Sequence, residues 1–408
     1  MSTTRHEPTY LDPDALRDAL ALRDLTDPAA GPHAMQQLLD LVVAGLRGAW
    51  DCSVRIVRTP PVVSVRDNYD RLRYRSDDVT RDRRYTRYVS PTTMLRSHTT
   101  AELPRVLDET RGRRDVDELV VVPGMVYRRD VVDRTHVGEP HQVDLWRVRS
   151  VAGTTADDLA DMVSCVVDAV LPAARWRLVE AVHPYTVGGR QVDVWHDGQW
   201  LELAECGVIH PDVLWSSGLR PDRWSGLALG MGLDRALMLR KGIPDIRYLR
   251  SRDPRVLAQL NDLDPWQAVS ALPAARRDLS VVLGPDADDE SVGDAVRTAL
   301  GVRSEVLESV RVVGSTPAAD LPEPVRRRLG ITAGQSNALV RIVLRPLDRT
   351  LTSREADEIR DVAYRAIHVG PYLELASRPD PATDGVDAVR RVPPLRGEAG
   401  RRSGRARG

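Results

Sequence analysis

The chain has 408 residues, with 58 Lys and Arg against 59 Asp and Glu, and 42% of its residues are hydrophobic. This length allows two domains with cores of their own, and the balanced charge excludes a wholly disordered or polyanionic chain. Phenylalanine is absent, although there are ten Tyr and eight Trp. If Phe were used as often as Tyr, a count of zero would have a chance of roughly e^-10, so the absence needs an explanation.

Three cysteines, Cys52, Cys165 and Cys206, are too few and too far apart for a disulfide framework or a cysteine-based zinc site. They are typical of a reducing compartment. No stretch approaches the roughly 18 apolar residues of a membrane span, and the opening ten residues lack the apolar part of a signal peptide. We therefore expect a cytoplasmic protein without a membrane partner.

Residues 1–30 form a polar N-terminal segment, interrupted by Pro and Gly. After it, hydrophobic periodicity predicts two helices, Met35–Leu46 and Thr155–Leu171. Residues 196–198, His-Asp-Gly, predict the turn of a hairpin. Strands are expected at Val54–Val57, Val62–Val65, Leu119–Val122, Met125–Tyr127, Gln142–Val148, Gln191–Trp195 and Trp200–Leu203. Many strands with few helices between them favour an α+β fold, an antiparallel sheet flanked by helices.

A second unit, residues 268–378, follows a linker at 256–267. Two helices with about four strands suit a small α+β sandwich. We expect strands at Arg277–Leu283 and Leu339–Leu344 and helices at Asp289–Leu300 and Ser353–Ile367. Residues 379–408 are rich in Pro, Gly and Arg, and we expect a disordered tail. Its charge would attract nucleic acid without specificity, or it is a solvated tail without function.

Two segments have the composition of a nucleotide site. Residues 124–144 bring Arg, His and acidic residues to strand-like positions. A sheet face of this kind suits a phosphate-bearing ligand, because guanidinium binds phosphate through two parallel hydrogen bonds; a solvated face with surface ion pairs is the alternative. Glycines at 226, 230 and 232 precede Arg235. They would let a flat ligand approach a strand that leads into a helix, although they lack the spacing of a dinucleotide fold.

Together these segments resemble the signature motifs of class II aminoacyl-tRNA synthetases, and among them the catalytic chain of phenylalanyl-tRNA synthetase. The resemblance covers residues 31–255, with the motifs in order. The segments that carry it are Thr59-Pro-Pro-Val-Val-Ser64, Leu95-Arg-Ser-His-Thr-Thr100, Tyr127-Arg-Arg-Asp130, Asp133-Arg-Thr-His136, His141-Gln-Val-Asp144, Trp200-Leu-Glu-Leu203, Cys206-Gly-Val-Ile-His210 and Gly232-Leu-Asp-Arg235.

Residues 268 to about 375 are similar to the small ferredoxin-fold anticodon-binding domain of the same enzymes, on the segments Arg276–Val282, Leu307–Arg311 and Arg345–Thr352. A catalytic core followed by this domain is the layout of the single-chain, mitochondrial-type enzyme. The resemblance therefore implies a monomer or homodimer that requires no β subunit.

The resemblance also implies ATP and Mg²⁺ as cofactors, and an aromatic amino acid and a tRNA, tRNA(Phe) in the family, as partners. Arg128 would contact the α-phosphate, Arg235 the far end of the bent ATP, and His136 would assist at the phosphates. Asp130, Glu202 and Gly232 would complete the ATP site, with Glu202 as the Mg²⁺ ligand. The implied amino-acid site consists of His98, Thr100, Gln142, Asp144, His183, Tyr185, Leu227, Ala228 and Leu229.

This chain departs from the family mainly in that amino-acid site. His183-Pro-Tyr185 stands where the family has Phe-Pro-Phe, and Leu227-Ala-Leu229 where it has Phe-Ala-Phe. Asp144 replaces Glu, and Thr100 replaces Ser. Either the substrate is unchanged and the exclusion of Phe forced the exchanges, or a more polar pocket admits a hydroxylated or otherwise modified phenylalanine.

Three functions stay open from the sequence. The first is ATP-dependent activation of phenylalanine and its transfer to tRNA(Phe), by a backup or resistance enzyme whose synthesis does not itself require Phe-tRNA. The second is activation of a modified aromatic amino acid for a biosynthetic pathway. The third is a non-catalytic protein that binds tRNA or an amino acid.

Overall fold

The computed structural model describes residues 10–81, 86–128, 131, 133–269 and 272–373. The predicted ATP-site residue Asp130 and the Arg-rich tail at 379–408 lie outside these ranges. No helix in the described ranges combines the length and the apolar character that a membrane crossing requires.

Within the described residues, seven strands form one large sheet in the order β1-β4-β5-β9-β8-β7-β6. Only β1 and β4 pair in parallel, and every other neighbouring pair is antiparallel. The strand bounds are β1 Ser53–Ile56, β4 Asp117–Met125, β5 His141–Arg149, β6 Trp176–Glu180, β7 Thr186–His196, β8 Gln199–Ile209 and β9 Ser225–Gly232. A separate two-stranded ribbon pairs β2 (Val62–Ser64) with β3 (Thr93–Leu95). The expected antiparallel sheet is thus confirmed.

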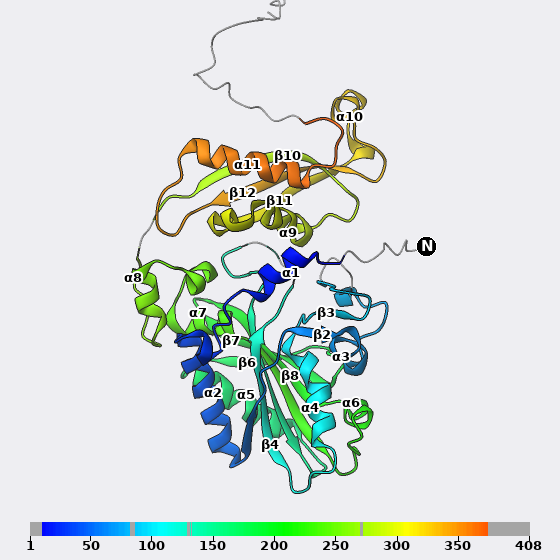
Figure 1. The fold of residues 1–408 in the computed structure, drawn as a ribbon, viewed down its shortest axis with the longest axis vertical. Helices are drawn as coiled ribbons and strands as arrows, with labels where there is room; N and C mark the ends of the chain where they lie inside the picture. Colours follow the sequence, from blue (N-terminus) through cyan, green and yellow to red (C-terminus); the bar gives the residue numbers. More distant parts are fainter. Residues whose placement is uncertain (1–9, 82–85, 129–130, 132, 270–271, 374–408) are drawn as a thin grey trace, which may run out of the picture. The chain divides into compact units, whose positions relative to one another are not determined.

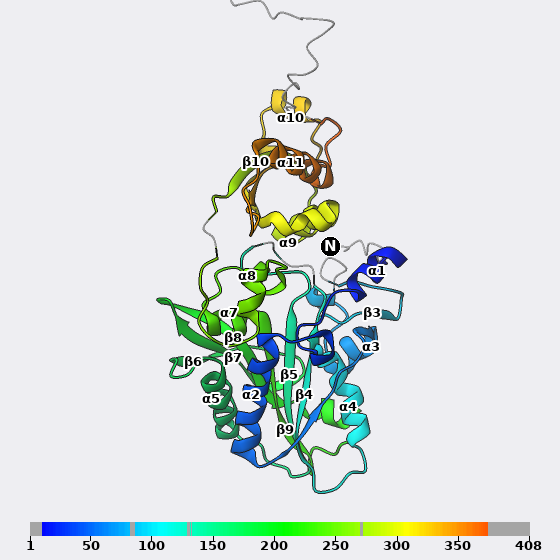
Figure 2. The same ribbon diagram turned by 60° about the vertical axis from the view of Figure 1, so that its left-hand side comes forward.

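Helices cover both faces of this sheet (Figures 1 and 2). One face packs against α2 (Ala34–Trp50), α5 (Ala156–Val170) and α7 (Leu233–Lys241), whose apolar residues share one core with the sheet. The other face packs against α4 (Leu103–Thr110) and α6 (Pro211–Ser216). Three further helices are α1 (Pro13–Leu20), α3 (Val65–Asn68) and α8 (Pro254–Leu257). Because side chains alternate along a strand, the buried residues of the sheet divide between the two cores.

Local sequence signals explain where several elements begin and end. At the start of α5, the Thr155 hydroxyl accepts a hydrogen bond from the backbone N–H of Asp158, and the Asp158 carboxylate accepts one from the backbone N–H of Thr155. Asp197 and Gly198 both have positive φ, +48° and +81°, at the hairpin turn between β7 and β8. That is the geometry of a type I′ turn, which Asp-Gly favours. The helix α1 lies inside the segment that the sequence marked only as polar.

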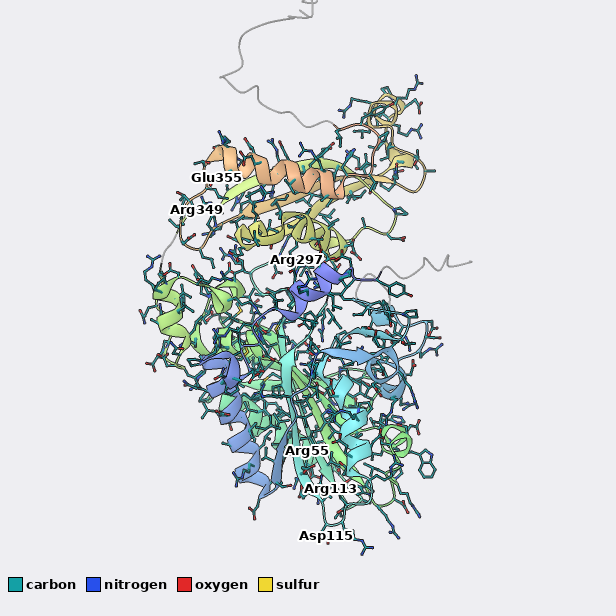
Figure 3. All side chains as sticks on the ribbon, in the orientation of Figure 1. Arg55, Arg113, Asp115, Arg297, Arg349 and Glu355 are labelled. Carbon is teal, nitrogen blue, oxygen red and sulfur yellow. The ribbon has the colours of Figure 1, made fainter. Side chains whose placement is uncertain are left out.

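A second sheet is built from residues 275–344. Its strands β10 (Ala275–Leu283), β12 (Ser336–Leu344) and β11 (Leu307–Pro317) pair antiparallel in that order. The helices of this part are α9 (Asp289–Leu300), α10 (Glu323–Leu329) and α11 (Ser353–Ile367). Glu355 closes a capping box with Thr352 at the start of α11 and also pairs with Arg349 at 2.9 Å (Figure 3).

This second sheet has three strands in the described residues, where the sequence suggested about four. As far as residue 367 the described elements run strand, helix, strand, helix, strand, helix, because α10 lies between β11 and β12. The sequence suggested two helices and did not include α10. The ferredoxin-like domain therefore remains a prediction.

The segment expected to be a linker, residues 256–267, is partly folded onto the large sheet. Val256 and Leu260 are buried in the same core as α2 and α5. Lys241, the only lysine of the chain, is buried at the end of α7. Its Nζ donates hydrogen bonds to the backbone oxygens of Asp262 and Asp264 and to the Asp262 carboxylate. These bonds hold the segment after residue 260 against α7.

Candidate active site

An open strip on the sheet follows the glycines of β9. A Cβ placed on Gly230 or Gly232 would meet no atom within 4 Å, so both positions face open space. Gly230 pairs with Asp144 on β5 and with Glu205 on β8. Because directly paired residues present their side chains on the same face, two carboxylates flank the space above Gly230. Gly226, further along the strand, is different: its Cβ would lie 2.1 Å from the backbone oxygen of Arg147.

Asp144 is the centre of a buried hydrogen-bond network. Thr99 Oγ1 donates to Oδ2 at 2.6 Å, Trp146 Nε1 donates to Oδ1 at 3.0 Å, and Thr100 Oγ1 lies 3.0 Å from both carboxylate oxygens. Asp144 is only 2% exposed. Burial raises its pKa to about 6, against the opposing effect of these donors. The carboxylate therefore joins the segment of Thr99 and Thr100 to β5.

A row of aromatic rings lies beside this network. Trp146, fully buried, stacks on Tyr185 with ring centroids 6.1 Å apart and an interplanar angle of 19°. Tyr185 meets Tyr74 at 6.4 Å, and Tyr74 stacks on His98 at 5.5 Å. Burial raises the pKa of Tyr185 well above its ordinary value. Ala228 is the cross-strand partner of Trp146 and belongs to the same core. The expected positions Tyr185, Ala228 and His98 are thus brought together.

His98 carries a buried polar atom without a partner. Its Nδ1 has no hydrogen bond. Its Nε2 lies 3.5 Å from the amide nitrogen of Asn68. Burial and the nearby charge of Arg128 lower the pKa of His98 to about 3, which keeps the ring neutral. A buried ring nitrogen without a hydrogen bond to the protein suits a polar group of a ligand.

A β-bulge determines the orientation of Glu202. The pairing of β7 with β8 shifts between Val192 and Asp193, so that Leu203 is an extra residue on β8. Leu203 and Ala204 both lie in the core with α2 and α5. Glu202 therefore returns to the face of Glu205, although strict alternation would place these two residues on opposite faces. Burial and the neighbouring Glu205 raise the pKa of Glu202, while Arg235 and Arg128 act against that rise.

Glu205 contacts the imidazole of His183, and both residues lie at the site. Nε2 of His183 is 3.1 Å from Oε1 of Glu205. The hydrogen bond from His183 lowers the pKa of Glu205, with burial opposing it. His183 belongs to the loop between β6 and β7 that also carries Tyr185. The sequence interpretation missed Glu205, Trp146 and Tyr74. The spacing of two residues from Asp144 on β5 would have indicated Trp146, whereas Glu205 depends on the register between β8 and β9.

Two arginines define the other end of the site. Arg128 lies in the loop after β4, half-buried, and its Nε donates to the backbone oxygen of Ser97 at 2.6 Å. It lies beyond the end of the strand and not on the sheet face that residues 124–144 suggested. Arg235, on α7, lies 3.3 Å from the backbone oxygen of Glu202 through Nη1 and 3.1 Å from Nε2 of His136 through Nη2.

His136 lies between an arginine and a carboxylate. Nδ1 of His136 is 2.9 Å from Oδ1 of Asp133. Burial alone would raise the pKa of Asp133, but the hydrogen bond with His136 contributes to a net lowering of that pKa. Asp133 therefore fixes the ring so that Nε2 faces Arg235. This chain of contacts positions the Arg235 guanidinium.

Two predicted positions do not reach this face of the sheet. Leu227 and Leu229 are buried in the core with α2 and α5, on the side opposite Ala228. Alternation along β9 requires this, because neighbouring residues of a strand point to opposite faces. Gln142 does lie on β5 opposite Gly232, and it is half-buried. No group of three or more His, Cys, Asp or Glu side chains arranged for a metal ion occurs among the described residues.

The chain was compared with known proteins. Residues 31–260 match the family described as tRNA synthetases class II core domain (F). The phenylalanine–tRNA ligase alpha subunit of Prochlorococcus marinus is 35% identical over 245 residues, which cover 58% of this chain and 69% of the relative. The mitochondrial phenylalanine–tRNA ligase of Saccharomyces cerevisiae is 26% identical and covers 81% of this chain and 85% of its own. A solved pyrrolysyl-tRNA synthetase structure from Desulfitobacterium hafniense shares 19% identity and a TM-score of 0.42, covering 53% of this chain and 73% of that one.

Proposed function

Because the chain belongs to the phenylalanine–tRNA ligase family of class II aminoacyl-tRNA synthetases, we propose that it activates phenylalanine with ATP and transfers it to tRNA(Phe). The observation that carries the proposal is the open strip at Gly230 and Gly232. An aromatic row borders it at one end, and Arg128 and Arg235 provide positive charge at the other.

The proposed reaction needs no nucleophile from the protein. A carboxylate oxygen of the amino acid attacks the α-phosphorus of ATP, the bond to pyrophosphate breaks, and an aminoacyl-adenylate forms. A ribose hydroxyl of the tRNA then attacks the carbonyl carbon and AMP leaves. Negative charge develops on the phosphate oxygens in the first step, so fixed guanidinium groups stabilise its transition state. Arg128 and Arg235 are held in place for this by Ser97 and His136.

The donors on this face suit Mg²⁺, the cofactor expected for ATP. Mg²⁺ is commonly held by one or two carboxylates together with the phosphates of the substrate, so a dedicated cluster of protein ligands is not needed. Glu202 is exposed beside Arg235 and shares its face with Glu205. We infer that Glu202 is the protein ligand. The ion, when bound, would neutralise charge on the phosphates.

Phenylalanine-dependent exchange between ATP and pyrophosphate tests this function. The wild-type chain should catalyse exchange, and Arg128→Gln should reduce the rate at least about 100-fold, the usual scale for a group that stabilises transition-state charge. Arg17→Gln, which changes an exposed arginine on α1, is the matched control and should retain the wild-type rate. If no aromatic amino acid supports exchange, the function is refuted.

A ring-substituted phenylalanine is a second candidate substrate. It is favoured by the polar side chains in the aromatic row, where the ring centroid of Tyr185 lies 6.4 Å from that of Tyr74 and 6.0 Å from that of His183. A site built to hydrogen-bond a hydroxyl can reject the analogue that lacks it by about 10⁴–10⁵. Exchange rates with para-hydroxy-, para-amino- and unsubstituted phenylalanine decide between the two candidates.

The acceptor is tested separately. Formation of aminoacyl-tRNA by the isolated chain, without a second subunit, would support the proposal of a single-chain enzyme. Tight tRNA binding without turnover would instead favour the non-catalytic alternative.

The absence of Phe codons supports a further part of the proposal, a backup or resistance role. A chain without Phe can be synthesised while Phe-tRNA is scarce. The amount of this protein in the cell should therefore be maintained while the housekeeping phenylalanine–tRNA ligase is inhibited. If deletion of its gene leaves sensitivity to such inhibition unchanged, the role is refuted.

A further inference from the structure

The α-ammonium group of the amino acid needs an anionic acceptor. Removing an ammonium from water is costly unless a carboxylate compensates for the lost hydration. Two carboxylates flank the open space above Gly230: Asp144 from β5 and Glu205 from β8. The resemblance to the family implies that His98, Thr100, Gln142 and Asp144 together hold the ammonium and carboxylate of the substrate, and Asp144 is the only anion among them.

Asp144 has little capacity left for a ligand. A carboxylate has about four lone-pair positions, and the three donors of its network, Thr99, Thr100 and Trp146, occupy three of them, with the Thr100 hydroxyl shared between the two oxygens. Only 2% of the residue is accessible. An ammonium would therefore have to reach the one remaining position inside a buried network.

Glu205 has the opposite properties. Its side chain is 44% exposed, and its contact with His183 uses Oε1, where the imidazole approaches from the loop side. No hydrogen bond to Oε2 is found among the described residues. The His183 contact lowers the pKa of Glu205, so the acceptor is ionised at neutral pH. Its cross-strand neighbour Gly230 leaves the space in front of it open.

The charged groups around Glu205 fit this role. Arg128 and Glu202 both interact with it electrostatically. Arg128 is held by Ser97 at the end where the phosphates of ATP are expected. An amino acid whose carboxylate faces Arg128 would place its ammonium a few ångströms away, toward β8. Its side chain would then point along β9 to the aromatic row.

We propose that Glu205 binds the α-ammonium group of the substrate, and that Asp144 is a positioning residue. Asp144 holds Thr99, Thr100 and the Trp146 indole in place. This inference rests on the proposed function, since it assigns a residue to the amino-acid site of that enzyme.

The test compares two probes that differ only in the amine: L-phenylalanine and 3-phenylpropanoate. Their affinities are measured by calorimetry on the full chain for the wild type, Glu205→Gln and Asp144→Asn. Glu205→Gln should weaken phenylalanine binding about 10- to 100-fold, the scale of a hydrogen bond to a charged group, and leave 3-phenylpropanoate binding unchanged. Asp144→Asn should leave the ratio of the two affinities unchanged, because Asp144 acts on both probes only through Thr99, Thr100 and Trp146. This cycle isolates the contact with the amine.

Several outcomes would overturn the inference. One is that Asp144→Asn, but not Glu205→Gln, abolishes the difference in affinity between phenylalanine and 3-phenylpropanoate. A second is that Glu205→Gln changes the Mg²⁺ dependence of ATP–pyrophosphate exchange but not the difference in affinity between the two probes. Glu205 would then be a metal ligand. A third is that Glu205→Gln removes only a preference for para-amino- or para-hydroxyphenylalanine, which would mean that Glu205 contacts the ring substituent of the substrate.

If the wild-type chain binds phenylalanine and Glu205→Gln retains its full affinity for phenylalanine, this inference fails but the proposed function stands. Absence of phenylalanine binding to the wild type refutes the proposed function itself.

A second variant gives a readout that a merely structural role would not move. His183→Gln removes the group that lowers the pKa of Glu205. Phenylalanine binding by this variant should therefore be lost at a higher pH on acidification than in the wild type. The pH at which 3-phenylpropanoate binding is lost should be the same in the variant and in the wild type. An equal rise of this pH for both probes would contradict the assignment.

Discussion

Replacing Asp144 by Asn should remove a pH dependence of stability that the buried carboxyl imposes. Burial raises the pKa of Asp144 from an ordinary 3.8 to about 6 in the folded chain. The two values differ by about 2 units, and each unit corresponds to about 1.4 kcal/mol, so the charged carboxylate costs about 3 kcal/mol of stability. Asn can keep the network, because its oxygen accepts from Trp146 and its amide donates to the oxygens of Thr99 and Thr100.

The sign follows from the direction of the shift. Above pH 6 the carboxyl is charged in both states, and the whole cost is present. As the pH falls from about 6 to about 4, the folded state takes up the proton first, and the wild type gains stability from this group. The free energy of unfolding of Asp144→Asn minus that of the wild type should therefore fall by about 2.5 kcal/mol between pH 7.5 and pH 4, since the unfolded carboxyl is still partly charged at pH 4.

Urea denaturation of both chains at a series of pH values measures this difference. Asp158→Asn is a control of opposite sign, since hydrogen bonds from Thr155 lower the pKa of Asp158. That variant should lose stability relative to the wild type at neutral pH and recover in acid. A difference between Asp144→Asn and the wild type that stays constant across the range would refute the reasoning.

Three further substitutions have expected outcomes. Lys241→Met leaves the oxygens that Lys241 satisfied without a donor, and urea denaturation should show a loss of about 2–3 kcal/mol. Gly226→Ala puts a methyl group against the backbone of Arg147, and should cost about 3 kcal/mol in the same assay. Gly232→Ala adds its methyl group to open space, so stability should change by no more than about 0.5 kcal/mol, while the KM for ATP in the exchange assay should rise.

Elements with local signals were predictable from the sequence. The helices Asp289–Leu300 and Ser353–Ile367 begin and end where predicted, because a capping box defines each start and an apolar stripe defines each length. The hairpin turn at Asp197 and Gly198 was equally local. In contrast, the bulge at Leu203 depends on how β7 meets β8, and no pattern within β8 reveals it.

The composition of the site was predictable only in part. The family motifs located Arg128, Arg235 and Asp144, and the structure brings them to one region of the sheet. Leu227 and Leu229 were assigned to the pocket by their place in a motif, although alternation around Ala228 already placed them on the opposite face. Glu205 became visible only through its register with Gly230, which is a contact between strands.

The burial of the only lysine has a chemical consequence for an enzyme of this class. An aminoacyl-adenylate is a mixed anhydride that acylates free amines, and surface lysines are the usual targets of such reagents. Nζ of Lys241 directs its hydrogen bonds to three acceptors and is 3% exposed as a residue, so it has no lone pair to offer an electrophile while it remains protonated. A molecule that forms this reactive intermediate would therefore present no lysine nucleophile on its own surface, and its charged exterior of arginines would stay unmodified.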